Sequence, residues 1–236
     1  MIKKILFDFE GNKYYWEKGN LDTKNGQIKE SELKKNKDKV KSNKNRDFFM
    51  MKANFLDQVE KIKRGPAIML PKDIGLILVY ANISKNSVVL EAGSGSGMLT
   101  IYLARAAKKV YSYELKEDFH KLAKKNLETL KIKNAVLKNK DIFEGIDEKN
   151  LDAIILDMLE PWRAVENCKK ALKESGYLVV YVTNINQLTM LMQNKSKLYV
   201  EKIVELLERT WIFDKQRTRP NSNIIGHTGF LVFLRK

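Results

Sequence analysis

From residue 72 onward, the spacing of the apolar positions changes repeatedly along the chain, which predicts helices and strands in alternation. Stretches with an apolar face at helical spacing predict helices over 73–82, 98–107, 117–130 and 164–173. Short apolar runs predict strands over 88–91, 110–114, 135–138, 151–157, 177–182, 204–213 and 230–234. Because strands that alternate with helices are typical of a parallel sheet, we expect an α/β fold with a seven-stranded, mostly parallel sheet and helices on both faces.

Residues 1–64 have a different pattern, with short strands separated by turns. Residues 2–9 alternate apolar and polar positions, and Glu10-Gly11-Asn12 then offers a hairpin turn before a strand over 13–16. A further strand is expected over 48–53. We therefore expect a small basic N-terminal β domain over 1–64 and a second domain over 65–236.

Charge adds a first indication of function, because the chain carries a formal net charge of +15. Such a charge attracts polyanions such as nucleic acid, although lysine-rich proteins also occur without such a partner. Residues 34–46 hold seven basic side chains and one acidic side chain, Asp38, which is compatible with a solvated loop or with an arm that contacts phosphates.

The composition also bears on where the protein works. No apolar stretch is long enough to span a bilayer, and the first residues alternate rather than form the apolar region of a signal peptide. A single cysteine, Cys168, fits a reducing compartment. We therefore expect a cytoplasmic protein without a membrane partner.

The sharpest motif is a glycine turn between the strand over 88–91 and the helix over 98–107. Gly93, Gly95 and Gly97 let the backbone approach a ligand closely, and the following helix N-terminus offers free N–H donors. A dinucleotide fingerprint would need a further glycine where this chain has Met98. The acid that precedes the turn, Glu91, suits a sulfonium-bearing cofactor better than a pyrophosphate.

The next predicted strand ends in an acid, and another acid comes after the third strand. Glu114 is placed to accept hydrogen bonds from two ribose hydroxyls, and Asp141 from an adenine amino group, although both also fit solvated acids at strand ends. With the glycine turn, these acids predict a Rossmann-like methyltransferase whose cofactor is S-adenosylmethionine, with Glu91, Gly93 and Gly95 in the binding site.

The fourth strand runs into Asp157, which should face the methyl group of the cofactor, since ligands bind at the carboxyl ends of parallel strands. Adenine N1 holds an in-plane lone pair, and its methylation leaves a cationic base. A carboxylate that accepts from the exocyclic amine would orient the base and stabilise this charge. Trp162 fits either hydrophobic packing or contact with a base. The chemistry requires no metal, and His120 and His227 form no spacing motif.

Several stretches resemble the tRNA adenine-N1 methyltransferases of bacteria and archaea, which are related to the catalytic subunit of the eukaryotic enzyme. They are Arg64-Gly65-Pro66, Pro71-Lys72-Asp73, the turn from Glu91 to Gly97, Tyr111 to Glu114, Asp157 to Trp162, Arg219-Pro220, and Ile225 to Val232. The resemblance covers essentially the whole chain, with 65–236 as the catalytic methyltransferase domain.

The resemblance implies a tRNA substrate methylated at the T-loop adenosine of position 58, or at 57 and 58, and a homotetramer. It makes Asp157 the catalytic carboxylate. The cofactor contacts that it implies are Met69, Ser96, Gly97, Met98, Glu114, Asp141 and Ile142. His227, within the most specific stretch, fits either a functional role or a structural role in a turn bracketed by glycines.

Two other interpretations remain at this point. A methyltransferase of the same fold could act on a protein or a small molecule, because fold does not determine function. A non-catalytic RNA-binding subunit of a methyltransferase complex is the second, but such subunits lose the glycine turn and the acid after the fourth strand, and both are present in this chain.

Overall fold

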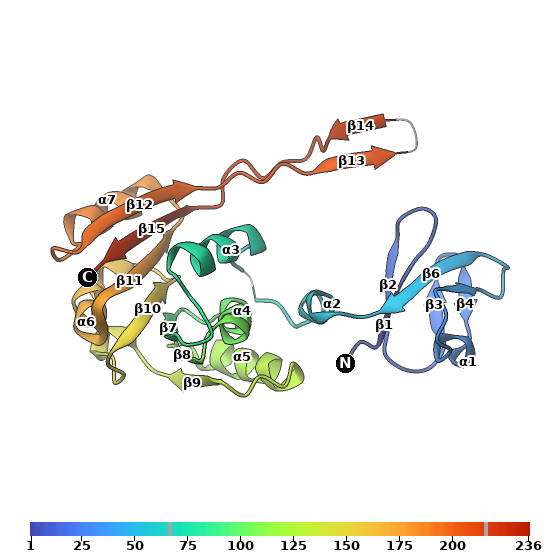
Figure 1. Ribbon diagram of the computed structural model, residues 1–236, viewed down its shortest axis with the longest axis horizontal. Helices are drawn as coiled ribbons and strands as arrows, with labels where there is room; N and C mark the ends of the chain where they lie inside the picture. Colours follow the sequence, from blue (N-terminus) through green and yellow to red (C-terminus); the bar gives the residue numbers. More distant parts are fainter. Residues whose placement is uncertain (66–67, 215–216) are drawn as a thin grey trace. The chain divides into compact units, whose positions relative to one another are not determined.

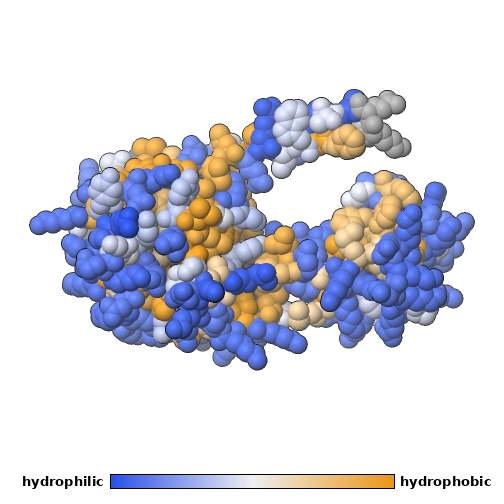
Figure 2. Space-filling view, in the orientation of Figure 1, coloured by the Kyte–Doolittle hydropathy of each residue, from blue (hydrophilic) through white to orange (hydrophobic). Residues whose placement is uncertain are grey.

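The computed structural model describes residues 1–65, 68–214 and 217–236, and Figure 1 traces the chain. Pro66, which belongs to one of the stretches on which the resemblance rests, lies outside these residues. The chain forms two compact units, Met1–Ile62 and Lys63–Lys236. Their surfaces are mostly hydrophilic with smaller hydrophobic areas (Figure 2).

The N-terminal unit is built on a four-stranded antiparallel sheet in the order β2-β1-β6-β5. Its elements are β1 (Lys4–Phe7), β2 (Lys13–Trp16), β3 (Leu21–Thr23), β4 (Gly26–Ile28), α1 (Glu30–Leu33), β5 (Lys39–Lys41), β6 (Asp47–Lys52) and α2 (Phe55–Val59). One face of the sheet packs against a small core that includes Leu6, Trp16, Phe48 and Met50. The predicted strands over 2–9, 13–16 and 48–53 correspond to β1, β2 and β6.

The second unit contains the seven-stranded sheet, in the order β12-β15-β11-β10-β7-β8-β9. Its strands are β7 (Val88–Ala92), β8 (Lys109–Glu114), β9 (Ala135–Asn139), β10 (Leu151–Leu156), β11 (Leu172–Val182), β12 (Tyr199–Glu205) and β15 (Phe230–Arg235). The pairs from β9 to β11 are parallel, and β15 pairs antiparallel with β11 and β12. The predicted seven-stranded, mostly parallel α/β fold is therefore confirmed.

Helices cover both faces of this sheet (Figure 1). Three of them, α3 (Pro71–Tyr80), α4 (Met98–Ala106) and α5 (Glu117–Thr129), lie on one face, and α6 (Val165–Ala171) and α7 (Ile185–Gln193) lie on the other. Two short 3-10 helices, η1 (Ile142–Glu144) and η2 (Pro161–Ala164), follow β9 and β10. No helix among the described residues is long and apolar enough to cross a membrane.

The prediction of one strand over 204–213 is wrong. β12 ends at Glu205, and β13 (Trp211–Asp214) pairs with β14 (Arg217–Pro220) in a separate two-stranded sheet. The reason lies in the partner strand: Glu205 pairs with Phe230, where β15 begins, so the ladder has no partner for the residues that follow Glu205.

Three helices were missed by the sequence analysis: α1, α2 and α7. α7 has a recognisable start, because the side chain of Asn184 accepts a hydrogen bond from the backbone N–H of Gln187. The segment 34–46 contains a strand, β5, so it is not wholly a loop.

Candidate active site

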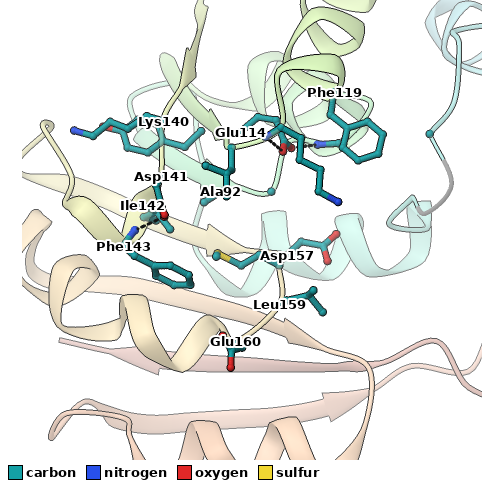
Figure 3. A pocket seen from close by; sticks show the side chains of 17 residues that line it. Ala92, Glu114, Phe119, Lys140, Asp141, Ile142, Phe143, Asp157, Leu159 and Glu160 are labelled. Atoms are coloured by element: carbon teal, nitrogen blue, oxygen red, sulfur yellow. Dashed lines mark hydrogen bonds between the residues drawn. The ribbon is translucent and has the colours of Figure 1, made fainter.

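A pocket of about 440 Å³ lies at the carboxyl ends of β7, β8, β9 and β10. Its size is within the range of about 300–1,000 Å³ that small-molecule sites occupy. Figure 3 shows Glu114 and Phe119 together on one side, with Asp141, Ile142 and Phe143 on another. Asp157, which follows β10, lies on a third side, below Glu114 and across from Asp141. The acids at the ends of these strands thus gather around one cavity.

The glycine turn after β7 takes backbone conformations that favour glycine, with φ angles of +92° at Gly93, +52° at Gly95 and +80° at Gly97. Gly93 has a second requirement, because a Cβ there would lie 1.9 Å from the carbonyl oxygen of Asp157. The turn and the backbone of Asp157 can approach this closely only because residue 93 has no side chain. The N–H of Asp157 also donates to the carbonyl of Ala92 at 3.0 Å.

Glu114, the last residue of β8, is held by the turn that it faces. Its carboxylate accepts from the backbone N–H groups of Gly95 and Lys116, both at 2.9 Å. Asp141 is oriented in a similar way, because its Oδ1 accepts from the backbone N–H of Phe143 at 2.8 Å. Its second oxygen has no hydrogen-bond donor among the described residues, so it is available to a ligand.

Asp157 is a partly buried acid of the pocket, and burial raises the pKa of its carboxyl from 3.8 to about 6. Water is withdrawn from the charged form, and no described residue donates a side-chain hydrogen bond to replace it. A raised pKa of this origin, on a group that lines a cavity, is typical of a functional carboxylate. The arrangement favours a ligand that brings positive charge or a hydrogen-bond donor to Asp157.

Glu91 lies behind the pocket rather than in its lining. It is 2% exposed, and its carboxylate accepts from the hydroxyls of Thr100 and of Ser112, the latter at 2.8 Å. Burial raises the pKa of Glu91 to about 7, and the charges of Asp157 and Glu114 add to this shift. Glu91 therefore connects β7 to α4 and β8 beneath the glycine turn.

The structure divides the predicted site residues into two groups. Those that line the pocket are Gly93, Gly95, Glu114, Asp141, Ile142 and Asp157. Those that lie outside its lining, all buried, are Met69, Glu91, Ser96, Gly97 and Met98. Ser96 is 2% exposed, and its Oγ has no hydrogen-bond partner among the described residues.

The sequence analysis missed several residues of the lining, including Gly65, Lys116, Lys140 and Phe143. Gly65 reaches the pocket because Asn126 anchors the chain before it. The Asn126 side-chain amide donates to the carbonyls of Lys63 and Ser96, both at 2.8 Å. Phe143 could have been predicted from the sequence, since it directly follows the predicted cofactor contacts Asp141 and Ile142. Trp162 packs against the main core, as its packing interpretation required.

The segment 226–229 has extensive contacts with the ends of the sheet. Nδ1 of His227 lies 2.5 Å from a carboxylate oxygen of Glu205, and its Nε2 lies 2.9 Å from the carbonyl of Thr183. The bond to Glu205 raises the pKa of the imidazole. The hydroxyl of Tyr181 donates to the carbonyl of Thr228 at 2.7 Å. These bonds favour the structural role of His227.

A buried ion pair joins this segment to the start of α3. Nζ of Lys72 donates to Asp73 and to the hydroxyl of Thr228, both at 2.7 Å, and the two charged side chains are 6% and 2% exposed. Removal of one member of such a pair leaves a buried charge without compensation.

We expect Lys72→Met to lower the free energy of unfolding by about 3 kcal/mol, because Asp73 would lose its counter-ion. Chemical denaturation measures this change, with Lys121→Met as the control, since Lys121 makes an exposed pair with Glu117 and should lose less than about 1 kcal/mol. Equal losses in the two variants would show that the buried pair does not hold the segment.

The chain is similar in sequence to known methyltransferases. The family model described as tRNA methyltransferase complex GCD14 subunit matches residues 60–218. The tRNA (adenine(57)-N(1)/adenine(58)-N(1))-methyltransferase TrmI of Methanocaldococcus jannaschii is 32% identical, over 98% of this chain and 94% of its own.

Two solved structures are similar over nearly the whole chain. The tRNA (m1A58) methyltransferase TrmI from Aquifex aeolicus has a TM-score of 0.87 and 28% identity, and the match covers 99% of this chain and 96% of its own. A protein from Thermotoga maritima described as a SAM-dependent O-methyltransferase has a TM-score of 0.89 and 27% identity, with coverages of 100% and 92%. The fold of this chain is thus one that solved methyltransferases have.

Proposed function

Because this chain belongs to the family of the tRNA methyltransferase complex GCD14 subunit, we propose that it methylates N1 of the T-loop adenosine of tRNA. The modified position is 58, or 57 and 58, and the methyl donor is S-adenosylmethionine. The observation that carries the proposal is the position of Asp157, a partly buried carboxylate with a raised pKa beside the glycine turn.

The residues of the pocket fit S-adenosylmethionine. Gly95 leaves room for close backbone contact, and a carboxylate oxygen of Asp141 is free to accept from an adenine amino group. Glu114 is oriented to accept from ribose hydroxyls, and the buried Oγ of Ser96 still has its hydrogen-bonding capacity. We propose that Met69, Glu91, Ser96, Gly97 and Met98, which are buried outside the lining, also belong to the cofactor-binding site. S-adenosylmethionine supplies an electrophilic methyl group carried on a sulfonium.

Asp157 has the role that the reaction at adenine N1 requires. The in-plane lone pair of N1 needs no base to remove a proton, so the protein must orient the ring and stabilise the positive charge that develops on it. An ionised Asp157 that accepts from the exocyclic amine does both. Burial strengthens this interaction because less water competes for the carboxylate.

We also propose that residues 1–64 form an RNA-binding domain, that 65–236 form the catalytic domain, and that the protein is a cytoplasmic homotetramer. The basic segment 34–46 supports the first proposal, since it would neutralise phosphates. The hairpin of β13 and β14 supports the assembly, because Trp211 and Phe213 are 61% and 81% exposed on strands that, within the described part of the chain, pair with each other alone. A second copy would cover this apolar surface.

The test is methyl transfer from labelled S-adenosylmethionine to an unmodified tRNA transcript, followed by digestion to nucleosides. We expect the label in N1-methyladenosine. The similarity to a protein described as an O-methyltransferase makes a ribose-methylated nucleoside the informative alternative. Label in that product, or in protein added in place of RNA, would refute the proposed function.

A further inference from the structure

The sheet of the N-terminal unit has a second face that is only partly covered. Along β6, Phe48 and Met50 point into the core, and the alternate residues Phe49 and Met51 are 40% and 50% exposed. Phe9, just after β1, is 73% exposed. Single exposed apolar side chains are common, but three together on one sheet face form a patch.

α2 and the two residues that follow it cover part of this face. Lys13 on β2 forms ion pairs with Asp57 and Glu60, both at 2.7 Å, and the ammonium of Lys61 lies 4.1 Å from the ring centre of Tyr15. The strands run in the order β2-β1-β6-β5, so these contacts lie on the β2 side and the exposed patch lies on the side of β6 and β5.

The rings of the patch have a defined geometry. Phe9 meets Phe49 edge to face, with ring centres 5.6 Å apart and planes at 65°. The ammonium of Lys39 lies 5.2 Å from the centre of the Phe49 ring. Lys39 and Phe49 are direct partners in the register of β5 and β6. Phe49 thus contacts the Phe9 ring, and the Phe9 side chain stays largely exposed to solvent.

Charge indicates what kind of partner the patch accepts. No carboxylate among the described residues pairs with Lys39, and β5 belongs to the segment 34–46 with its seven basic side chains and one acidic side chain. A second copy that presented the same basic segment would bring like charges together and would be repelled there. A polyanion with flat apolar bases fits both the rings and the lysines.

We propose that Phe9, supported by Phe49, stacks an unpaired base of the tRNA, while Lys39 contacts an adjacent phosphate. This inference rests on the proposed function. The reacting base must leave its stack to reach Asp157, so the bound RNA is locally opened and exposes other unpaired bases. Aromatic side chains beside a basic groove are the usual means of holding such bases without sequence readout.

The experiment compares the dissociation constant of an unmodified tRNA transcript for the intact protein and for three variants, each over a range of salt concentrations. Phe9→Ala should weaken binding by about fivefold or more without changing the salt dependence, because it removes stacking. Lys39→Gln should make the plot of log association constant against log salt concentration less steep, by about one, because it removes one phosphate contact. Tyr199→Ala is the matched control: its side chain is 69% exposed but lies on β12, so neither quantity should change.

Thermal unfolding and light scattering of each variant complete the measurement. If Phe9→Ala leaves the dissociation constant unchanged while the intact protein methylates the transcript, the stacking surface is wrong and the proposed function stands. A fall in oligomeric mass in Phe9→Ala would assign the patch to an interface between copies and would also overturn the inference. If the intact protein neither binds nor methylates the transcript, the proposed function itself has failed.

Discussion

Asp157→Asn is expected to lower kcat by about 100-fold to 1,000-fold, the usual effect of removing a preorganised charge from the transition state. The amide keeps an oxygen that accepts a hydrogen bond but cannot balance the charge that develops on the base. Cofactor affinity should change much less, since Gly95, Glu114 and Asp141 remain in place. Single-turnover methyl transfer and isothermal titration with S-adenosylmethionine separate these two effects.

The raised pKa of Asp157 gives this variant a second signature. The carboxylate must be ionised to act, so kcat/KM of the intact protein should fall as the pH is lowered through about 6. This acidic limb should be absent from the residual activity of Asp157→Asn. Turnover of Asp157→Asn equal to that of the intact protein would remove Asp157 from the mechanism.

Stability should change in the opposite direction to activity. Because the folded-state pKa lies above the ordinary value of 3.8, ionisation of Asp157 disfavours the folded state. That penalty is absent below about pH 4, grows between about pH 4 and 6, and is fully present above about 6. Asp157→Asn should therefore be more stable than the intact protein by about 1–3 kcal/mol at pH 8, with little difference at pH 4.

Gly93→Ala is expected to lose about 3–5 kcal/mol of folding free energy and nearly all cofactor binding. The added Cβ would lie 1.9 Å from the carbonyl oxygen and 2.8 Å from the carbonyl carbon of Asp157. It would also impose a φ of +92° on a residue with a side chain. Either the turn or the backbone of Asp157 must move, and both belong to the pocket.

Gly95→Ala is the matched control for stability. Its φ of +52° lies in the left-handed region, but the nearest atom that an added Cβ would meet is 4.0 Å away. The variant should therefore lose only about 1–2 kcal/mol, which is the strain of the backbone alone. Chemical denaturation of both variants gives the comparison. Similar losses in the two would show that the close approach of Gly93 to Asp157 is not what requires glycine.

The features that sequence predicted well are those set by local order along the chain. The glycine turn and Asp157 each follow a buried strand directly, Glu114 ends one, and parallel strands bring such positions to one edge. Glu91 was predicted in the binding site because it precedes the glycine turn. Its side chain instead accepts hydrogen bonds from Thr100 and Ser112 behind the pocket. Which side of a strand a residue faces depends on the packing of α4, which the spacing of residues does not show.

Other features depend on contacts between distant parts of the chain. Lys72 bonds to Thr228 across 156 positions, and the end of β12 is determined by where β15 begins. Lys140 and Phe143 line the pocket because of the path that the chain takes after β9. Neither periodicity nor motif spacing contains this information, because each describes one segment at a time.

The most direct test of the central claim is primer extension on a tRNA transcript after incubation with the protein and S-adenosylmethionine. N1-methyladenosine blocks Watson–Crick pairing, so reverse transcriptase stops at the modified base. We predict a stop in the T-loop, at position 58 or at 57 and 58, that disappears when the adenosine is replaced and when Asp157→Asn is used in a short incubation. A transcript that is read through without a stop, although the protein binds the cofactor, would contradict the account.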